Sequence, residues 1–276
     1  MLNFDGKITH ENDLKLSYQN RAFKYGDAIF DTIKFENNTL QFIEDHYFRI
    51  MSSLRMLRMK IPMIFTLEYY NDQIIKTVEA NNLHKARIRV SIFRKDGGLY
   101  GPKDNNISFL IEANKLKIKN DISYEIDLFK DFHITSGVLS NIKTNNRILN
   151  VLAAVFVDEF DLSNCVLINE NKNIVEAINA NIFLIKGNDV YTPSLDQGCI
   201  NGIIRKKIIE VLGQNEKYNI YQTGISPFEL LKADEVFLTN SIMSIKNVTK
   251  YRKTKYDNVK TMEIKELFEK YFRKDA

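Results

Sequence analysis

The sequence is poor in the residues that mark several classes of protein. It contains two cysteines, Cys165 and Cys199, and neither stands in a CxxC or Cys/His spacing that could hold a metal ion. Such sparse cysteine usage is typical of a reducing compartment, so we expect a cytoplasmic protein without a metal site. Only 4 prolines and 11 glycines occur in 276 residues, which argues against a long disordered or low-complexity segment.

Long hydrophobic runs and one-sided charge are missing as well. The longest strongly apolar run covers residues 151–157, whereas a helix needs about 20 apolar residues to cross a bilayer. Residues 1–10 contain no apolar segment of the kind that a secretion signal carries. The 39 basic and 35 acidic residues are mixed along the chain, while nucleic-acid-binding proteins usually cluster their basic residues. We therefore expect neither a membrane nor a nucleic-acid partner.

The remaining composition, 44% hydrophobic and 27% charged, is that of a globular protein of one or two domains. In the first part of the chain, residues 28–35 and 39–43 flank Asn37-Asn38 and predict a β-hairpin. A helix is expected from Glu44 onward, and further strands are expected over 86–93 and 107–113. We expect only one helix in this N-terminal third.

The polar, lysine-rich segment 114–121 is predicted to link two domains, an N-terminal one of residues 1–113 and a C-terminal one of residues 122–276. The second domain is expected to begin with a helix over about 145–160, whose apolar stripe includes Leu149, Leu152 and Phe156. The elements expected after it are hairpins over 165–168 with 174–177 and 182–185 with 190–192, a helix over 203–212 and a strand over 236–239.

Several short motifs occur in a fixed order along the chain. They are Tyr25-Gly26-Asp27-Ala28-Ile29-Phe30-Asp31-Thr32, His46-Tyr47-Phe48-Arg49, Ser140-Asn141-Ile142-Lys143-Thr144-Asn145-Asn146, Glu176-Ala177-Ile178-Asn179-Ala180-Asn181, Ile200-Asn201-Gly202-Ile203-Ile204-Arg205 and Glu235-Val236-Phe237-Leu238-Thr239-Asn240-Ser241. Together they resemble the signature of the class IV aminotransferases, which are fold-type IV pyridoxal-phosphate enzymes. Each motif alone is weak, but their order from residue 25 to residue 241 is specific.

The resemblance implies an α/β (α+β) fold, with a small N-terminal α+β domain and a larger barrel-like C-terminal domain that enclose pyridoxal 5'-phosphate at their junction. It implies that Lys143 bonds covalently to the cofactor and acts as acid and base. Glu176 matches the carboxylate that keeps the pyridine nitrogen protonated. Arg49, the backbone N–H groups of Ile203 and Ile204, and Ser241 match the phosphate ligands. Many relatives have threonine where Ile204 stands, so only backbone donation is carried over.

The resemblance assigns several other residues to the substrate pocket or leaves their role open. Tyr25, Phe30, Arg87 and Arg89 match strands that form the substrate pocket of relatives; Arg89 resembles a pocket arginine of branched-chain enzymes, and Arg87 replaces their tyrosine. Arg147 matches either a contact to the cofactor ring oxygen or substrate, or an ordinary helix arginine. His46 is expected to pack or hydrogen-bond rather than to react. The family also implies a homodimer.

Two activities remain open. The first is transamination between an amino acid, of the branched-chain type, and a 2-oxo acid. The alternative is a 4-amino-4-deoxychorismate lyase, which forms 4-aminobenzoate and pyruvate with the same lysine and cofactor. Arg89 favours the former, while Arg147 and the Gly97-Gly98 loop favour the latter. A third class is a non-enzymatic binding protein or a basic nucleic-acid module, and a yellow purified protein would argue strongly against it.

Overall fold

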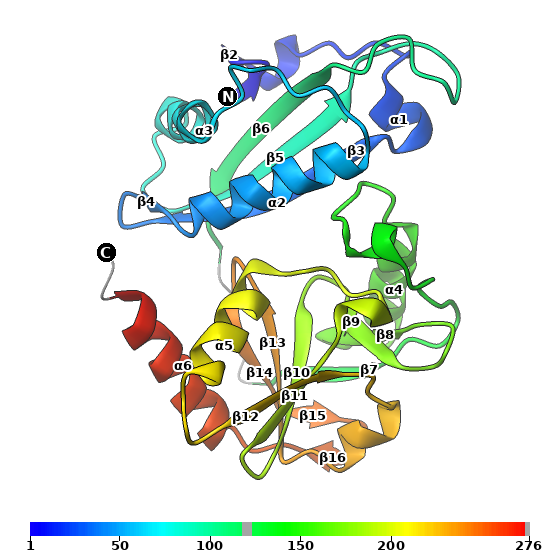
Figure 1. The fold of residues 1–276 in the computed structure, drawn as a ribbon, viewed down its shortest axis with the longest axis vertical. Helices are drawn as coiled ribbons and strands as arrows, with labels where there is room; N and C mark the ends of the chain where they lie inside the picture. The colour runs from blue at the N-terminus through cyan, green and yellow to red at the C-terminus, as the bar shows by residue number, and fades with distance from the viewer. Residues whose placement is uncertain (118–122, 274–276) are drawn as a thin grey trace. The chain divides into compact units, whose positions relative to one another are not determined.

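A computed structural model describes residues 1–117 and 123–273 of the chain (Figure 1). These residues divide into two compact units, of which the first contains residues 1–117 and 143–146 and the second contains residues 123–142 and 147–273. In the described part of the chain, no helix is long and apolar enough to cross a membrane.

The first unit is built on an antiparallel sheet with strand order β2-β1-β6-β5-β3-β4. Its helices α2 and α3 pack on the sheet, α2 against β3 and α3 against β6 (Figure 1). Its elements are β1 (Leu2–Phe4), β2 (Lys7–Thr9), α1 (Arg21–Tyr25), β3 (Ala28–Glu36), β4 (Thr39–Leu40), α2 (Ile43–Met56), α3 (Leu67–Ala80), β5 (Ala86–Arg94) and β6 (Ile107–Lys115).

Local sequence explains the central hairpin of this unit. Asn37 and Asn38 have φ angles of 54° and 57°, which suit the tight turn between β3 and β4 and which asparagine tolerates better than most residues. Along β3, residues such as Ile33 and Phe35 are buried while the residues between them are partly exposed. The alternation gives the sheet one face toward the helices and one open face.

The second unit contains two five-stranded sheets, β12-β11-β10-β13-β14 and β16-β15-β7-β8-β9, in the described part of the chain. Its elements are β7 (Glu125–Leu128), α4 (Ile148–Glu159), β8 (Asn164–Ile168), β9 (Ile174–Ala177), β10 (Asn181–Lys186), β11 (Asp189–Pro193), α5 (Ile203–Gly213), β12 (Asn219–Thr223), β13 (Glu235–Asn240), β14 (Ser244–Val248), β15 (Lys250–Tyr251), β16 (Thr254–Lys255) and α6 (Val259–Arg273).

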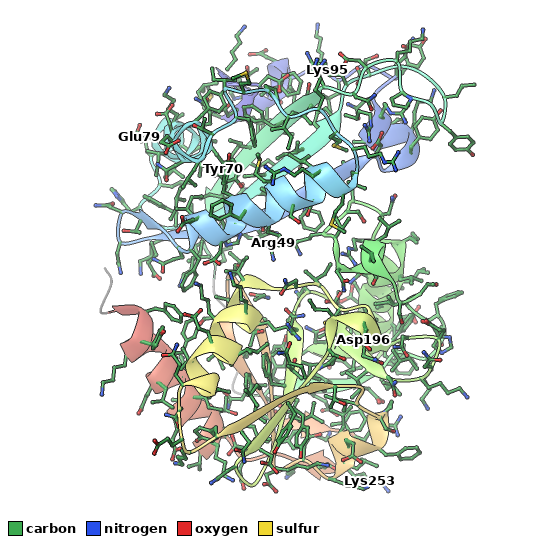
Figure 2. The ribbon with its side chains drawn as sticks, in the orientation of Figure 1. Arg49, Tyr70, Glu79, Lys95, Asp196 and Lys253 are labelled. Carbon is green, nitrogen blue, oxygen red and sulfur yellow. The ribbon has the colours of Figure 1, made fainter. Side chains whose placement is uncertain are left out.

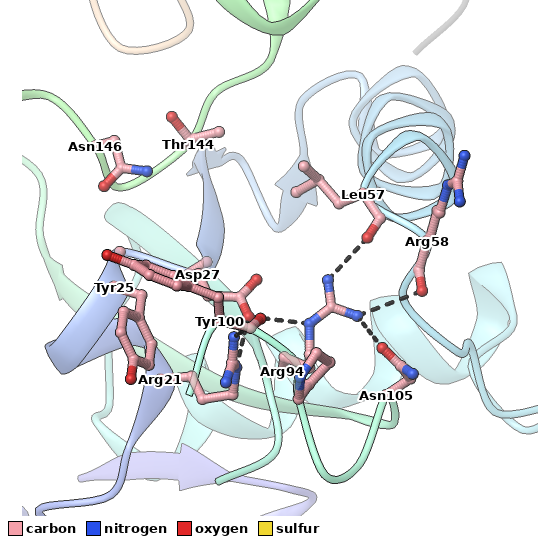
Figure 3. Close-up of a pocket in the computed structure, with 13 residues that line it drawn as sticks. Arg21, Tyr25, Asp27, Leu57, Arg58, Arg94, Tyr100, Asn105, Thr144 and Asn146 are labelled. Carbon is pink, nitrogen blue, oxygen red and sulfur yellow. Dashed lines mark hydrogen bonds and ion pairs between the residues drawn. The ribbon is translucent and has the colours of Figure 1, made fainter. Parts of the chain in front are cut away.

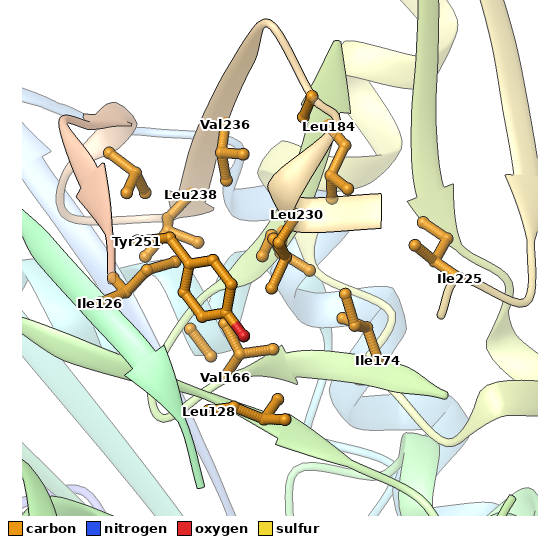
Figure 4. Close-up of a cluster of buried hydrophobic side chains, with 14 of the residues drawn as sticks. Ile126, Leu128, Val166, Ile174, Leu184, Ile225, Leu230, Val236, Leu238 and Tyr251 are labelled. Atoms are coloured by element: carbon orange, nitrogen blue, oxygen red, sulfur yellow. The ribbon is translucent and has the colours of Figure 1, made fainter. Parts of the chain in front are cut away.

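Both sheets of the second unit contribute to one hydrophobic core (Figure 4). Ile126 and Val166 come from one sheet and Leu184 and Leu238 from the other, and each is at most 1% exposed. A core shared by two curved sheets has the character of a barrel, so the expected barrel-like domain and the mixed α/β fold class are confirmed.

Three features differ from the sequence-based predictions. The helices α1 and α3 were not expected in the N-terminal third, where we predicted one helix, which is α2. The predicted linker 114–121 begins inside β6, which extends to Lys115, and its part from residue 118 onward lies outside the described residues. The helix expected from about 145 starts at Ile148, because residues 143–146 are extended and belong to the first unit.

Candidate functional site

Lys143 lies on a short extended segment beside the start of β3. The N–H of Phe30 donates to the Lys143 carbonyl at 2.9 Å, and the N–H of Asn145 donates to the Ala28 carbonyl at 2.9 Å. Ile29 and Thr144 form an antiparallel bridge between these two hydrogen bonds. The backbone of Lys143 is therefore fixed by β-pairing, so its position does not depend on a loop.

This pairing brings Lys143 to Phe30 and Arg89, two of the predicted pocket residues. The Lys143 Nζ is 4.5 Å and the Arg89 Cζ is 3.8 Å from the centroid of the Phe30 ring. Arg89 Nε also donates to Ser91 Oγ at 3.3 Å, and it lies 4.0 Å from the Glu112 carboxylate. Partial burial lowers the pKa of Arg89, a shift that Glu112 opposes. Two cations at one aromatic ring suit an anionic substrate group.

The other two predicted pocket residues are placed differently. Arg87 lies on β5 with an exposed side chain, directly across from Lys34 of β3. Tyr25 ends α1 and lines a cavity of about 450 Å³ within the first unit, in which its ring lies 5.7 Å from the Tyr100 ring (Figure 3). The residues of this cavity include Thr144 of the Lys143 segment.

A buried charge cluster supports the wall of the cavity (Figure 3). Asp27 Oδ2 accepts from Arg21 Nε at 2.7 Å and from Arg94 Nε at 2.9 Å, and both arginines are less than 10% exposed. Other N–H groups of the two arginines donate to main-chain carbonyls, such as those of Leu57 and Leu99, and Arg94 Nη1 also donates to Asn105 Oδ1. Two guanidinium groups share one carboxylate, so the wall carries a net positive charge. Sequence reasoning did not give Arg21 or Asp27 this role.

Arg49 is on α2 and reaches the buried carboxylate of Asp31 on β3 (Figure 2 labels Arg49). His46, one helical turn earlier, lies with its Nδ1 3.1 Å from the same carboxylate. Burial alone would raise the pKa of Asp31, but the Arg49 charge holds that pKa well below its ordinary value. Asp31 was quoted only as part of a strand motif, so the structure adds it to the site.

Glu176 ends up on β9 of the second unit and is 5% exposed. Its Oε2 accepts from the backbone N–H of Ile200 at 2.9 Å, while Asn181 Nδ2 donates to the Ile200 carbonyl at 2.8 Å. The peptide groups on both sides of Ile200, which precedes the turn into α5, are thus fixed by two side chains. A backbone N–H bond favours the ionised carboxylate.

Ile203 and Ile204 form the first turn of α5 and are both buried. Gly202 caps the helix without a side chain, and the first turn has no acidic residue. Within the described residues, the N–H groups of Ile203 and Ile204 have no hydrogen-bond partner. A Cβ on Gly202 would lie 2.0 Å from Asn181 Oδ1, so only glycine fits this close approach. The turn therefore offers unpaired donors at the positive end of a helix dipole.

Ser241 lies at the turn between β13 and β14. Asn240 Oδ1 accepts from the N–H groups of Ile242 and Met243 at 2.9 and 2.8 Å, which fixes the turn around Ser241. Two residues earlier, Thr239 is 1% exposed and its buried hydroxyl has no partner among the described residues. Sequence reasoning gave Thr239 no role, because an unpartnered buried hydroxyl is visible only in a structure.

Arg147 precedes α4, and its Nη2 donates to the Ile142 carbonyl at 2.8 Å. Burial lowers the pKa of Arg147, and the charge of Glu176 opposes that shift. Arg147 is partly buried and interacts electrostatically with Glu176, and both interpretations of it that the sequence left open stay predictions.

Comparison with known proteins decides the family. Residues 28–251 match the family model described as amino-transferase class IV. The chain belongs to this family. It is 28% identical to an aminodeoxychorismate lyase of Vibrio harveyi, over 83% of this chain and 84% of that protein. It is 26% identical to a putative branched-chain-amino-acid aminotransferase of Methanocaldococcus jannaschii, over 87% and 84% of the two chains.

The fold of this class IV aminotransferase is found in solved structures. The branched-chain aminotransferase of Thermoproteus uzoniensis superposes with a TM-score of 0.87, covering 99% of this chain and 93% of that one at 20% identity. Class IV aminotransferases are pyridoxal-phosphate enzymes, so the predicted enzyme class and cofactor are confirmed.

The described residues fit such a cofactor. A phosphate group needs hydrogen-bond donors, and the uncapped start of α5 and the partnerless hydroxyl of Thr239 supply them in the second unit. A protonated pyridine nitrogen needs a carboxylate, and Glu176 is a buried carboxyl group whose Oε2 accepts from the Ile200 N–H. The lysine required for a covalent link is Lys143, whose backbone is held in place by β3.

Proposed function

We propose that this class IV enzyme transfers an amino group from an amino acid, of the branched-chain type, to a 2-oxo acid. The observation that carries the proposal is the fixing of Lys143 by backbone pairing with β3, next to Phe30 and Arg89. A lysine amine beside a hydrophobic ring and a cation can receive the α-proton of a substrate whose carboxylate the cation holds.

The cofactor, when bound, serves as the electron sink for this chemistry. Lys143 Nζ would hold the cofactor covalently and, once freed by the substrate amine, would carry the substrate α-proton. Glu176 keeps the proton on the ring nitrogen. Arg49, the N–H groups of Ile203 and Ile204, and the hydroxyl of Ser241 hold the phosphate, and we add the hydroxyl of Thr239 to this set.

The substrate is proposed to meet Tyr25, Phe30, Arg87 and Arg89. Phe30 supplies apolar surface for a branched side chain, and Arg89 supplies a charge for a carboxylate. Arg147 is proposed to act on the cofactor ring, because it interacts electrostatically with Glu176.

A second function, 4-amino-4-deoxychorismate lyase, has its own support. Arg147 is the residue that favours this activity in the sequence, and it interacts electrostatically with Glu176. The relative from Vibrio harveyi bears the name of that enzyme.

One experiment separates the two functions. Leucine, added alone to the yellow enzyme, is expected to remove the absorbance band of the bound cofactor in a single turnover, and 2-oxoglutarate is expected to restore it. A lyase would leave the band in place and would convert aminodeoxychorismate to pyruvate and 4-aminobenzoate. The second result without the first would replace the proposed function with its alternative.

We also propose that the enzyme works as a homodimer. Support comes from α4, where Ile148, Val151, Leu152 and Val155 recur on one side and are 37–67% exposed. Sedimentation equilibrium at micromolar concentration tests this, and a monomer would contradict it.

A further inference from the structure

We propose that Asp31 and His46 are positioning residues, which orient the guanidinium of Arg49 for the cofactor phosphate. The inference rests on the proposed role of Arg49. It concerns the cluster of these three side chains, which joins β3 to α2 inside the first unit.

The geometry of Asp31 is tightly determined. The residue is 1% exposed, and its Oδ1 accepts from the backbone N–H of Thr32 at 2.6 Å. Both carboxylate oxygens face Arg49: Oδ2 lies 3.3 Å from Nε, and Oδ1 accepts from Nη2. A planar guanidinium held by two of its nitrogens has one orientation, because rotation about its last bonds would break both contacts.

His46 supports the carboxylate from α2. It is 1% exposed, its Nδ1 is 3.1 Å from Asp31 Oδ1, and its Nε2 is buried without a partner among the described residues. A proton on Nε2 would be a buried donor without an acceptor, so the arrangement favours a proton on Nδ1, donated to Asp31. His46 thereby restricts Asp31, and Asp31 restricts Arg49.

Charge and orientation make opposite predictions for this cluster. Asp31 cancels the charge of Arg49, so it weakens the attraction of the pair for a phosphate dianion. If charge alone mattered, removing the Asp31 charge would tighten cofactor binding. If orientation matters more, the same change weakens binding. The sign of the effect therefore tests the proposal.

The test titrates the apoprotein with pyridoxal 5'-phosphate and, separately, with pyridoxal, which lacks the phosphate. Arg49→Ala and Asp31→Asn are each expected to raise the Kd for pyridoxal 5'-phosphate about tenfold, the scale of one charge-assisted hydrogen bond. The Kd for pyridoxal should change less than about twofold, since its binding involves no phosphate contact. A purely structural defect would weaken both ligands alike.

A matched control is available on the same strand. Glu36 of β3 pairs with Lys34 and with Lys85, each at 2.6 Å, and takes no part in the cluster. We define the Kd ratio as the Kd for pyridoxal 5'-phosphate divided by the Kd for pyridoxal. Glu36→Gln should leave this ratio unchanged. In an Arg49→Ala background, Asp31→Asn should have no further effect on that ratio, because the residue it orients is gone.

His46 gives a second route if Asp31→Asn does not fold. His46→Leu removes the donor to Asp31 and should raise the Kd ratio, while His46→Asn, which can donate from nearly the same place, should keep it near the wild-type value. Equal ratios for all three proteins would overturn the role of His46.

The outcomes separate this inference from the proposed function. If Arg49→Ala leaves the ratio unchanged, Arg49 does not bind the phosphate, and the assignment in the proposed function fails together with the inference. If Arg49→Ala raises the ratio while Asp31→Asn lowers it or leaves it unchanged, the positioning role alone is overturned.

Discussion

The two units present their candidate site residues by different means. In the first unit, the groups are charged side chains held by other charged side chains: Arg49 by Asp31, and Arg94 together with Arg21 by Asp27. In the second unit, the groups are mainly backbone N–H donors at the start of α5, in a turn that Glu176 and Asn181 hold in place.

The difference predicts which kind of substitution disturbs the candidate residues of each unit. Ion networks inside a protein depend on every partner, since one lost charge leaves another buried without compensation. Backbone donors depend on the shape of the chain, which a single misplaced methyl group can change. The first unit should therefore be sensitive to changes of charge, and the second to changes of volume.

Lys143 stands outside this comparison and should show the largest effect. Lys143→Ala removes the amine that bonds to the cofactor and moves the proton, so turnover should fall by at least about a thousandfold. Turnover and the absorbance of the bound cofactor are the two measurements. Lys76→Ala on α3, which is an exposed lysine, is the control and should behave as wild type. If the Lys143→Ala variant keeps the absorbance band, and borohydride reduction links the cofactor to another lysine, then Lys143 is not the lysine that binds the cofactor.

Glu176→Gln tests a charge in the unit where shape is expected to dominate. The amide oxygen can still accept from the Ile200 N–H, so the turn should survive while the charge is lost. We expect turnover to fall by at least about a hundredfold, equivalent to roughly 3 kcal/mol, with a modest change in cofactor affinity. Glu229→Gln, on the surface of the same unit, is the control. Turnover within threefold of wild type would place the essential carboxylate elsewhere.

Elements set by short-range sequence were predictable. The β3–β4 hairpin followed from Asn37-Asn38 between two apolar runs, and α5 followed from its periodic isoleucines after a glycine turn. The helix α3 was missed because its buried face includes Gln73 and Thr77, so the apolar stripe is interrupted. Its N-cap, Thr66, accepts from the Tyr69 N–H, which is a local signal that could have revealed it.

Site residues were predictable where they stand in a sequence motif. They were not predictable where only tertiary packing brings them to the site. Lys143, Glu176 and Arg49 stood in recognisable motifs, and their assignments remain predictions to be tested by mutation. The pairing of residues 143–146 with β3 was not predictable, because it joins segments more than 100 residues apart. For the same reason the apolar stripe of α4 could be read from the sequence, but not that Ile148 and Val155 are exposed.

Gly202→Ala tests the dependence of the second unit on shape. The added Cβ would lie 2.0 Å from Asn181 Oδ1, so the turn into α5 must shift and its N–H groups must move. The backbone φ of −68° is itself suitable for alanine, so the expected effect is steric. We expect affinity for pyridoxal 5'-phosphate to fall about tenfold, the scale of one or two lost hydrogen bonds.

Gly213→Ala, at the other end of the same helix, is the matched control for that experiment. A Cβ there meets nothing within 4 Å, so cofactor affinity should be unchanged. If Gly202→Ala binds the cofactor as tightly as Gly213→Ala does, the start of α5 does not hold the phosphate. The expected sensitivity of the second unit to changes of volume is then contradicted.

The smallest expected effect is a change in the thermal stability of the first unit with pH, which tests how far that unit depends on charge. Burial raises the pKa of Asp31, but Arg49 and His46 together outweigh burial and hold that pKa far below its ordinary value of 3.8. Its contribution to stability is therefore present above pH 4 and is lost as the pH falls toward the folded pKa. Between pH 7 and pH 3 the loss of stability amounts to about 1 kcal/mol.

Asp31→Asn has no such group, so its melting temperature should lie below that of wild type at pH 7. The difference between the two melting temperatures should narrow by roughly 2–4 °C at pH 3. Thermal melts of both apoproteins across this range give the measurement. A difference in melting temperature that stays constant or widens toward pH 3 would show that Asp31 is not held ionised by Arg49. Ion pairs would then contribute less to the stability of the first unit than we expect.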